Sequence, residues 1–469
     1  MTEISDKAEK FVKRNKLFLI FLAVFAVTQL AIVKATWNSP LIWDSSVYVG
    51  MGKRMFSGWQ FGIWELFRPL TLPVILGSLW KLGMPLIGFP RLVALVISVA
   101  GVAGIYIMIK DVFEKRIAFY STAILMSTFI FYKYSHYALT GIPSAILVFT
   151  GAYFAQKDKT VSSGFLTSLG FLTRFPAATA APGMAIYMFL RSVKEGISLR
   201  SIKKPLIYTV SFFATTVPYF AYNYYLYGDI LAPLIQGSAI PASNPDKYFY
   251  GVFYLLEALK AQPFLIFLPL GIYAMFKARD WDYGAFFAPM VTLYLFFSVY
   301  SHKEPRFMLL FLPFMALFAG LGLKKIQERE IISEKAFYTV VTVILAVSML
   351  LSFSVVYGQS QWVNTNRVEF MQETAKLNGT VAGNDPVVVT YGDFRFVPIR
   401  PENLDKIYGN IKGEADYYAI NSCAWYCYPA IENCEQKLAN FTSMMDQEYD
   451  KKFYNEGNSC NYTIYEGRN

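Results

Sequence analysis

Six consecutive residues, His302–Phe307 (HKEPRF), place four polar or charged side chains between two apolar runs, 284–300 and 307–323. A charge near lipid costs on the order of a few kcal/mol unless it meets water, a partner or a charged ligand. Cations in such a place suit a phosphate, because they bind its oxygens and offset its charge. We therefore predict a site for a lipid-borne phosphate, whose ligands are Arg306, Lys303, His302 and Glu304.

Each of these residues also has a structural interpretation, which the sequence leaves open. Arg306 has an acidic neighbour, Glu304, with which it can form an internal salt bridge. Lys303 can extend its ammonium group to the lipid headgroups. His302 can be a hydrogen-bonded structural histidine. A bidentate guanidinium fits phosphate best, so Arg306 is the first candidate among them.

A carboxylate that could act as a base lies elsewhere, at Asp44 in the sequence Trp43-Asp44-Ser45-Ser46. The tryptophans around it are typical of an aromatic belt at a membrane surface, but an acid gains nothing from such anchoring. Three further charges near apolar runs join the predicted site: Glu65, Arg68 and Arg174.

One carboxylate and a group of cations suit the transfer of a sugar from a polyprenyl phosphate. The acceptor hydroxyl needs a base within hydrogen-bond reach as it attacks the anomeric carbon. The leaving group is a lipid phosphate, whose developing charge the cations stabilise. No metal or other cofactor is required for this chemistry, and the first loop contains no DxD triplet.

The composition shows which elements must position these residues. Of the 469 residues, 55% are hydrophobic and only 16% are charged, with a mean hydropathy of +0.35. Average soluble proteins contain about 25% charged residues, so this chain is a membrane protein. The net charge of +10 lies mostly in short loops between apolar runs, as the positive-inside rule requires. No nucleic-acid motif accompanies it.

Eleven membrane helices are predicted from the apolar runs. The basic loops follow the even-numbered helices, which places those loops and the N-terminus in the cytoplasm. Residues 70–87, which contain Pro73 and Pro85 and follow Pro69, form either a helix that lies in the interface or a span, and the sequence leaves this open. The predicted helices are 17–33, 88–109, 117–132, 140–155, 161–173, 176–190, 205–226, 252–276, 282–300, 306–323 and 336–357.

An odd number of helices places the C-terminal tail outside the cytoplasm. The tail contains all four cysteines, an even number that suits two disulfides of unspecified pairing. A zinc site is the alternative, but the tail has no histidine and no CxxC pair. Three acceptor triplets for N-glycosylation lie in the same segment. The cysteines are Cys423, Cys427, Cys434 and Cys460.

The predicted organisation is therefore an all-α polytopic membrane domain, 1–357, followed by an extracytoplasmic α/β domain, 358–469. The membrane domain has a long first external loop, 34–87, and the tail has short strands at 386–390, 416–420 and 461–465. This topology puts the polar groups of five loops on the external face. Such an arrangement is expected of a site that works on a lipid-anchored substrate.

The acid in the first external loop, the apolar helical body and the external tail resemble those of the GT-C superfamily of glycosyltransferases. The string HKEPRF is similar to the HKExRF motif of its dolichyl-phosphate-mannose-dependent α-mannosyltransferases, and Trp64-Glu65 with Arg68 is similar to a pair in their first loop. That family usually has adjacent acids in the first loop, where this chain has Asp44 alone. Archaeal relatives often carry an acid before Ile-Pro, where this chain has a glycine before Ile142-Pro143, and the chain resembles a divergent archaeal member.

The resemblance implies an inverting enzyme with a dolichyl- or polyprenyl-phosphate mannose donor. The acceptor is a glycan, a lipid or a protein, and another hexose is the alternative to mannose. An archaeal member would lie in the plasma membrane and a eukaryotic one in the endoplasmic reticulum. The alternative from another class is a transporter of polyprenyl-linked sugars, which predicts inverted repeats that this sequence does not display.

Overall fold

The computed structural model describes residues 9 and 12–466, apart from the short gaps given at the end of this paragraph. The Cα positions divide the chain into two units. The helical unit comprises 1–34, 92–230 and 246–359, and the loop–tail unit comprises 35–91, 231–245 and 360–469. The gaps are 195–198, 243–250, 279–282, 363, 402–403, 405–414, 426, 428–430 and 458–459.

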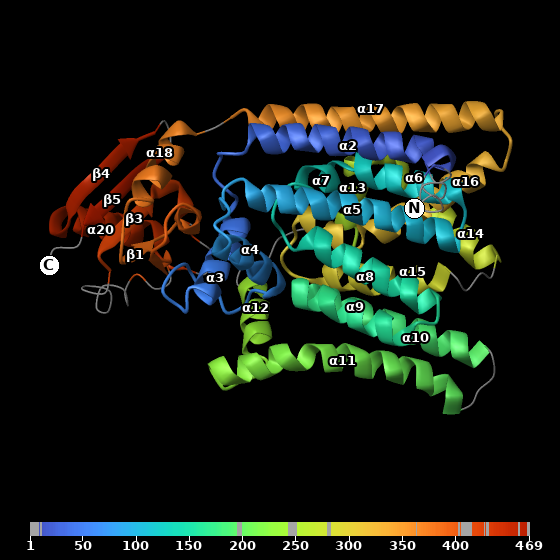
Figure 1. The fold of residues 1–469 in the computed structure, drawn as a ribbon, viewed down its shortest axis with the longest axis horizontal. Coiled ribbons are helices and arrows are strands. Elements are labelled where there is room, and N and C mark those ends of the chain that lie inside the picture. The colour runs from blue at the N-terminus through green and yellow to red at the C-terminus, as the bar shows by residue number, and fades with distance from the viewer. Residues whose placement is uncertain are drawn as a thin grey trace. The chain divides into compact units, whose positions relative to one another are not determined.

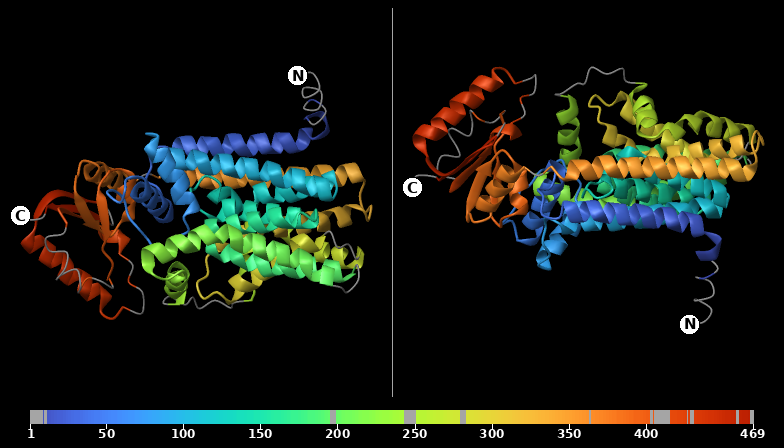
Figure 2. Two further views of the ribbon diagram at one scale, coloured as in Figure 1. Left: turned by 60° about the horizontal axis from the view of Figure 1, so that its bottom comes forward. Right: turned by 90° about the horizontal axis from the view of Figure 1, so that it is seen from above.

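The helical unit is a bundle whose long helices run roughly alongside one another (Figures 1 and 2). The sequence forms helices here because the apolar runs contain few residues that break them. The helices are α2 (Lys16–Ala35), α5 (Phe89–Val112), α6 (Lys115–Ser127), α7 (Phe129–Tyr134), α8 (Gly141–Gln156), α9 (Thr160–Thr173), α10 (Ala180–Lys194), α11 (Leu199–Tyr227), α13 (Phe253–Ala261), α14 (Leu268–Ala278), α15 (Gly284–Val299), α16 (Leu312–Gln327) and α17 (Glu334–Ser360).

Helix α16 lies in the centre of this bundle, and nearly every one of its residues is buried. It packs against α6 and α14 through small residues. A side chain at Gly320 would collide with Ser121 of α6, and one at Gly322 would collide with the backbone of Phe267. Small residues are how membrane helices approach one another closely. The HKEPRF segment directly precedes this helix, so its position is fixed from the C-terminal side.

Three helices among the described residues are long and apolar enough to cross a membrane by themselves, namely α2, α5 and α17. Shorter apolar helices occur at Gly141–Gln156, Pro263–Ala278 and Gly284–Val299. The chain is therefore an integral membrane protein, whereas the count of eleven spans stays a prediction. In the segment left open, 70–87, the structure has helix α4 (Thr71–Lys81). Its 11 residues span only about 16 Å, too short for a bilayer.

Several predicted helices are interrupted, which corrects the sequence prediction. The predicted helix 252–276 is three elements, α13, the 3₁₀-helix η2 (Pro263–Phe267) and α14. The predicted helix 306–323 is the 3₁₀-helix η4 (Pro305–Leu310) followed by α16, and 176–190 begins with η1 (Phe175–Thr179). Both η2 and η4 begin with a proline, which forces the preceding residue into an extended conformation. The predicted helix 117–132 is also divided, by the extended backbone of Thr128 between α6 and α7.

The loop–tail unit contains a five-stranded mixed sheet in the order β2-β1-β3-β5-β4. Strand β1 pairs in parallel with β2 and β3, whereas β5 pairs in antiparallel fashion with β3 and β4. The strands are β1 (Thr380–Gly383), β2 (Arg395–Pro398), β3 (Tyr417–Asn421), β4 (Asp450–Glu456) and β5 (Asn461–Glu466). The helices of this unit are α3 (Trp43–Phe56), α4, α12 (Ala232–Ala242), α18 (Thr365–Thr374) and α20 (Cys434–Glu448).

Apolar side chains cover both faces of this sheet. Alternate residues of β1 point to opposite faces, so Val381 belongs to one core with α18 and Ala382 belongs to another with α20. The predicted α/β character of the tail and the strands at 416–420 and 461–465 are confirmed. The third predicted strand, 386–390, is wrong. It is the 3₁₀-helix η5 (Pro386–Thr390), because Pro386 cannot donate to a sheet and Asp385 caps the turn.

The tail contains two disulfides, as predicted, and the structure decides their pairing. Cys423 bonds to Cys460, and this disulfide joins the end of β3 to the start of β5. Cys427 bonds to Cys434, the first residue of α20. Each pair has its Cα atoms 5.3 or 5.7 Å apart, within the normal range for a disulfide.

The first predicted loop, 34–87, belongs to the same unit as the tail. It contains α3 and α4, and its residue Gly62 adds to the edge of β2. The backbone N–H of Gly62 donates to Phe394 at 2.8 Å, and the N–H of Phe396 donates back to Gly62 at 3.0 Å. The buried ammonium group of Lys53 on α3 donates to Gly392 at 2.9 Å and pairs with Asp393 at 2.8 Å. These bonds fix α3, and with it Asp44, to the sheet.

Gly62→Ala is expected to destabilise the loop–tail unit by about 2 kcal/mol or more. Gly62 has a φ of +80°, and a Cβ there would collide with the carbonyl oxygen of Gly50. Thermal unfolding of the purified protein in detergent measures this effect. Gly58→Ala is the matched control, since Gly58 has a φ of +63° but no atom near its Cβ position. Equal losses for both variants would contradict the packing argument.

Candidate active site

Asp44 lies in the first turn of α3 and forms an ion pair with Arg68. The distance from Arg68 Nη2 to Asp44 Oδ1 is 2.8 Å. Both side chains are mostly buried, with 17% of Arg68 and 16% of Asp44 exposed. The guanidinium also lies over the rings of Tyr48, at 5.6 Å, and Phe67, at 5.1 Å. Arg68 therefore has a fixed position from which it orients the Asp44 carboxylate.

Glu65 shares Arg68 with Asp44. Its Oε2 accepts from Arg68 Nε at 2.9 Å, and its Oε1 accepts from Arg400 Nη2 at 2.9 Å. The Glu65 side chain is only 4% exposed, so a carboxylate there requires these partners. We call these four residues, Asp44, Glu65, Arg68 and Arg400, the carboxylate cluster. Its two acids and two arginines carry no net charge.

Arg68 remains charged in this cluster. Burial by itself would lower the pKa of Arg68, but the charges of Asp44 and Glu65 raise it well above its ordinary value. The guanidinium of Arg68 is shared between the carboxylates of Asp44 and Glu65, so Asp44 interacts with only part of its positive charge. This arrangement holds Asp44 in place.

The HKEPRF segment forms a second cluster within the helical unit. Glu304 precedes Pro305 and has an extended backbone, with φ −127° and ψ 134°. In an extended segment, side chains two positions apart point to the same side of the backbone. His302 Nε2 accordingly lies 2.7 Å from Glu304 Oε1, and Arg306 Nη2 donates to the same oxygen at 3.2 Å. Arg306 Nε also contacts the other Glu304 oxygen.

Lys303 points in another direction and is only 5% exposed. Its ammonium group donates to the carbonyl oxygens of Phe297 at 2.6 Å, Ser298 at 2.9 Å and Tyr300 at 2.5 Å. These carbonyls lie at the end of α15, where a helix leaves its last acceptors without backbone partners. These contacts hold Lys303 at the base of the loop, and its contact with phosphate stays a prediction.

Arg174 joins this second cluster through Phe307. Its guanidinium lies 5.2 Å from the centre of the Phe307 ring, and the ring of His302 contacts the same phenylalanine edge-on at 5.7 Å. Arg174 Nη1 also donates to Thr140 Oγ1 at 3.4 Å. Arg174 begins the break between α9 and η1, where its backbone is extended. We call His302, Lys303, Glu304, Arg306 and Arg174 the cationic cluster.

Glu304 stays ionised to low pH in this cluster. Burial opposes its charge, but the hydrogen bond with His302 and the charge of Arg306 outweigh burial and lower the pKa of Glu304 to about 2. A carboxyl whose pKa falls on folding contributes stability above its unfolded pKa of 4.5 and loses it as the pH approaches 2.

The difference in unfolding free energy between the native protein and Glu304→Gln is therefore expected to have its largest value above pH 5. It should shrink steadily as the pH falls from about 4.5 toward 2. Unfolding midpoints in detergent over this pH range measure it. The control is Glu328→Gln, an exposed acid paired with surface lysines, where less than about 1 kcal/mol is expected at any pH. A difference for Glu304→Gln that does not change with pH would contradict the assignment.

The structure thus gathers the predicted site residues into two clusters, one in each unit. The sequence missed Arg400, since 335 positions separate it from Glu65 and no local pattern marks it. Phe307 was noticed as part of the motif, but its contact with Arg174 was not predicted. The buried His136 has its Nδ1 3.0 Å from the side-chain oxygen of Gln29.

Solved structures with the same fold include membrane enzymes of the GT-C type. ArnT from Cupriavidus metallidurans, bound to undecaprenyl phosphate, matches with a TM-score of 0.69 at 12% identity. The match covers 96% of this chain and 98% of ArnT. The archaeal oligosaccharyltransferase AglB from Archaeoglobus fulgidus, in complex with an inhibitory peptide and a dolichol-phosphate, matches with a TM-score of 0.58 at 12% identity. That match covers 97% of this chain and 75% of AglB.

These similarities and the helical bundle with its small sheet define a membrane glycosyltransferase of the GT-C type. The model of the Alg9-like mannosyltransferase family matches residues 17–394, most of the chain. The chain belongs to this family. No curated protein sequence matches it.

Proposed function

We propose that this protein transfers mannose, or another hexose, from a dolichyl- or polyprenyl-phosphate donor to an acceptor outside the cytoplasm. The reaction inverts the configuration at the anomeric carbon. Membership of the Alg9-like mannosyltransferase family supports the sugar. Polyprenyl phosphates in the complexes of ArnT and AglB support the donor class. The acceptor is a glycan, a lipid-linked glycan or a protein.

The observation that carries the proposal is the ion pair between Asp44 and the permanently charged Arg68. Asp44 acts as the base that takes the proton of the acceptor hydroxyl during attack. Arg68 keeps the carboxylate oriented, and Glu65, which also pairs with Arg400, helps to hold Arg68 in place.

The cationic cluster takes the other role in the reaction, that of holding the lipid phosphate as it leaves. Arg306 and His302 exchange part of their contact with Glu304 for phosphate oxygens, and Arg174 adds a second guanidinium. Lys303 keeps the loop in place through the end of α15. Because these side chains supply the positive charge, the transfer proceeds without a metal ion.

The test uses the purified full-length protein with labelled dolichyl-phosphate-mannose and a panel of lipid-linked glycans. We expect an α-linked product from the β-linked lipid donor, and a rate that changes less than twofold when EDTA is added. Parallel reactions contain polyprenyl-phosphate-glucose and GDP-mannose as donors. A product formed from GDP-mannose alone, or the complete loss of transfer with EDTA, would contradict the proposal.

A further inference from the structure

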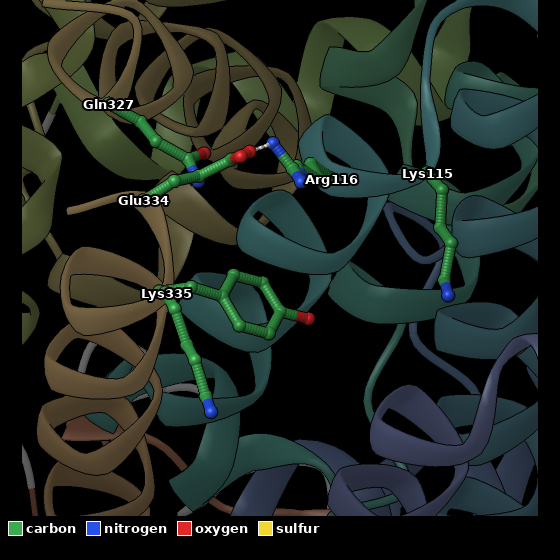
Figure 3. A pocket seen from close by; sticks show the side chains of 6 residues that line it. Lys115, Arg116, Gln327, Glu334 and Lys335 are labelled. Atoms are coloured by element: carbon green, nitrogen blue, oxygen red, sulfur yellow. Dashed lines mark hydrogen bonds and ion pairs between the residues drawn. The ribbon is translucent and has the colours of Figure 1, made fainter. Parts of the chain in front are cut away.

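A cavity of about 360 Å³ lies in the helical unit, where α6 and α17 begin (Figure 3). This volume falls within the range of about 300–1,000 Å³ that is usual for small-molecule sites. None of its residues belongs to the carboxylate cluster or the cationic cluster, so the proposed sugar transfer does not use it. The lining residues are Lys115, Arg116, Gln327, Glu334, Lys335 and Tyr338.

Positive charge dominates this lining, with three cations against one acid. The acid, Glu334, is already engaged by an ion pair with Arg116 and by Gln327 Nε2, which donates to it at 3.4 Å. No carboxylate of the described residues pairs with Lys115 or Lys335, which Figure 3 shows on opposite sides of the cavity. The cavity therefore contains two positive charges that the described part of the chain does not neutralise.

The surrounding backbone and side chains add to this positive field. Both α6 and α17 begin at the cavity, and the unpaired N–H groups of a helix N-terminus carry partial positive charge. The side chain before α6, Glu114, does not cap that helix. Lys110 lies within electrostatic reach of Lys115 and of Arg14. Gathering like charges costs free energy, which an anion bound among them would offset.

The protein surface next to the cavity is formed by apolar side chains. From Val340 onward, α17 exposes Val340, Val343, Ile344, Val347 and Leu351, each with 47–62% of its surface exposed. Their spacing of three and four residues places them on one face of the helix. Tyr338, two residues before Val340, packs against Phe119 and Tyr120 of α6 with ring centres 5.5 and 5.8 Å apart. An aromatic ring between a charged end and an apolar face is typical of the headgroup level of a membrane.

We propose that this cavity binds the headgroup of an anionic phospholipid of the surrounding membrane. Its phosphate lies between the ammonium groups of Lys115 and Lys335, and an acyl chain follows the exposed face of α17. A free phosphate ion would use the same cations but would gain nothing from the apolar face. The lipid stabilises the pairing of α6 and α17, whichever sugar the enzyme transfers.

Native mass spectrometry of the delipidated full-length protein tests this, with phosphatidylglycerol or phosphatidylcholine added. We expect one phosphatidylglycerol to be retained about tenfold or more in preference to phosphatidylcholine. Each lysine near a membrane surface is worth about fivefold in affinity for anionic lipid, so Lys115→Gln/Lys335→Gln should remove most of this preference. The unfolding midpoint of each variant without lipid verifies that it folds.

The matched control is Lys203→Gln/Lys277→Gln, which removes two exposed lysines of the helical unit away from the cavity. It should keep the preference for phosphatidylglycerol. An equal loss in both double variants, or no loss in Lys115→Gln/Lys335→Gln, would overturn the proposal. So would inorganic phosphate at millimolar concentration if it displaced phosphatidylglycerol completely, since that result would assign the cavity to a free anion.

Discussion

Asp44→Asn is expected to reduce the rate of sugar transfer by about 10²–10⁴-fold, the usual contribution of a general base. Asparagine keeps the shape of the side chain, and its carbonyl oxygen can still accept from Arg68 Nη2, now 2.8 Å from Asp44 Oδ1. What the variant loses is the capacity to take a proton from the acceptor hydroxyl. The loss should therefore appear in kcat, with a small change in the KM of the donor.

Two variants decide between a catalytic and a structural explanation of this result. Asp44→Glu restores a carboxylate and should recover part of the activity. Asp229→Asn makes the same chemical change at an exposed acid in another loop and should stay within twofold of the native rate. Transfer by Asp44→Asn at the native rate, in membranes supplied with labelled donor, would remove Asp44 from the mechanism. An unfolding midpoint equal to that of the native protein verifies that the fold is retained.

Arg306→Ala is expected to lower kcat/KM for the lipid-phosphate donor by about 10²-fold or more, because one charged donor to the leaving phosphate is removed. Arg306→Lys keeps the charge but loses the planar fork, so it should recover only part of the activity. The KM of the acceptor should change little in either variant. Initial rates over a matrix of donor and acceptor concentrations separate the two constants.

Glu304→Gln distinguishes phosphate binding from a purely structural salt bridge. In the structure Arg306 is bound to Glu304, and a bridge with no other purpose would be broken equally by changing either partner. We expect Arg306→Ala to impair the use of donor at least tenfold more than Glu304→Gln does. Equal effects of the two variants on donor kinetics would show that Arg306 acts only through Glu304.

The sequence predicted local features well, where the signal lies in neighbouring residues. The apolar runs identified the helices, and the alternation in 461–465 identified a strand, now β5. Prolines explain most of the errors. Pro263 begins a 3₁₀-helix within a run that hydropathy alone reads as continuous. Pro305 begins a 3₁₀-helix that takes up the first residues of the predicted helix 306–323, and Pro386 begins one in place of a predicted strand. Each error occurs where the backbone, rather than the side chains, sets the conformation.

Contacts between distant segments were beyond the sequence prediction. Two ion pairs, Glu65 with Arg400 and Lys53 with Asp393, join the first loop to the tail. The three carbonyl acceptors of Lys303 at the end of α15 were likewise visible only in three dimensions. Such pairings depend on which surfaces pack together, and no local pattern encodes them.

By itself, the sequence determined that this is a membrane protein with a disulfide-bearing α/β tail and a charged HKEPRF segment of a known glycosyltransferase family. Composition, cysteine count and a short motif are sufficient for that, because each is read within a few residues or over the whole chain. Only the tertiary structure decided that Cys423 pairs with Cys460, that Arg68 is shared between Asp44 and Glu65, and that α16 lies at the centre of the bundle. These features depend on long-range packing, in which a partner is chosen by shape and burial rather than by its place in the sequence.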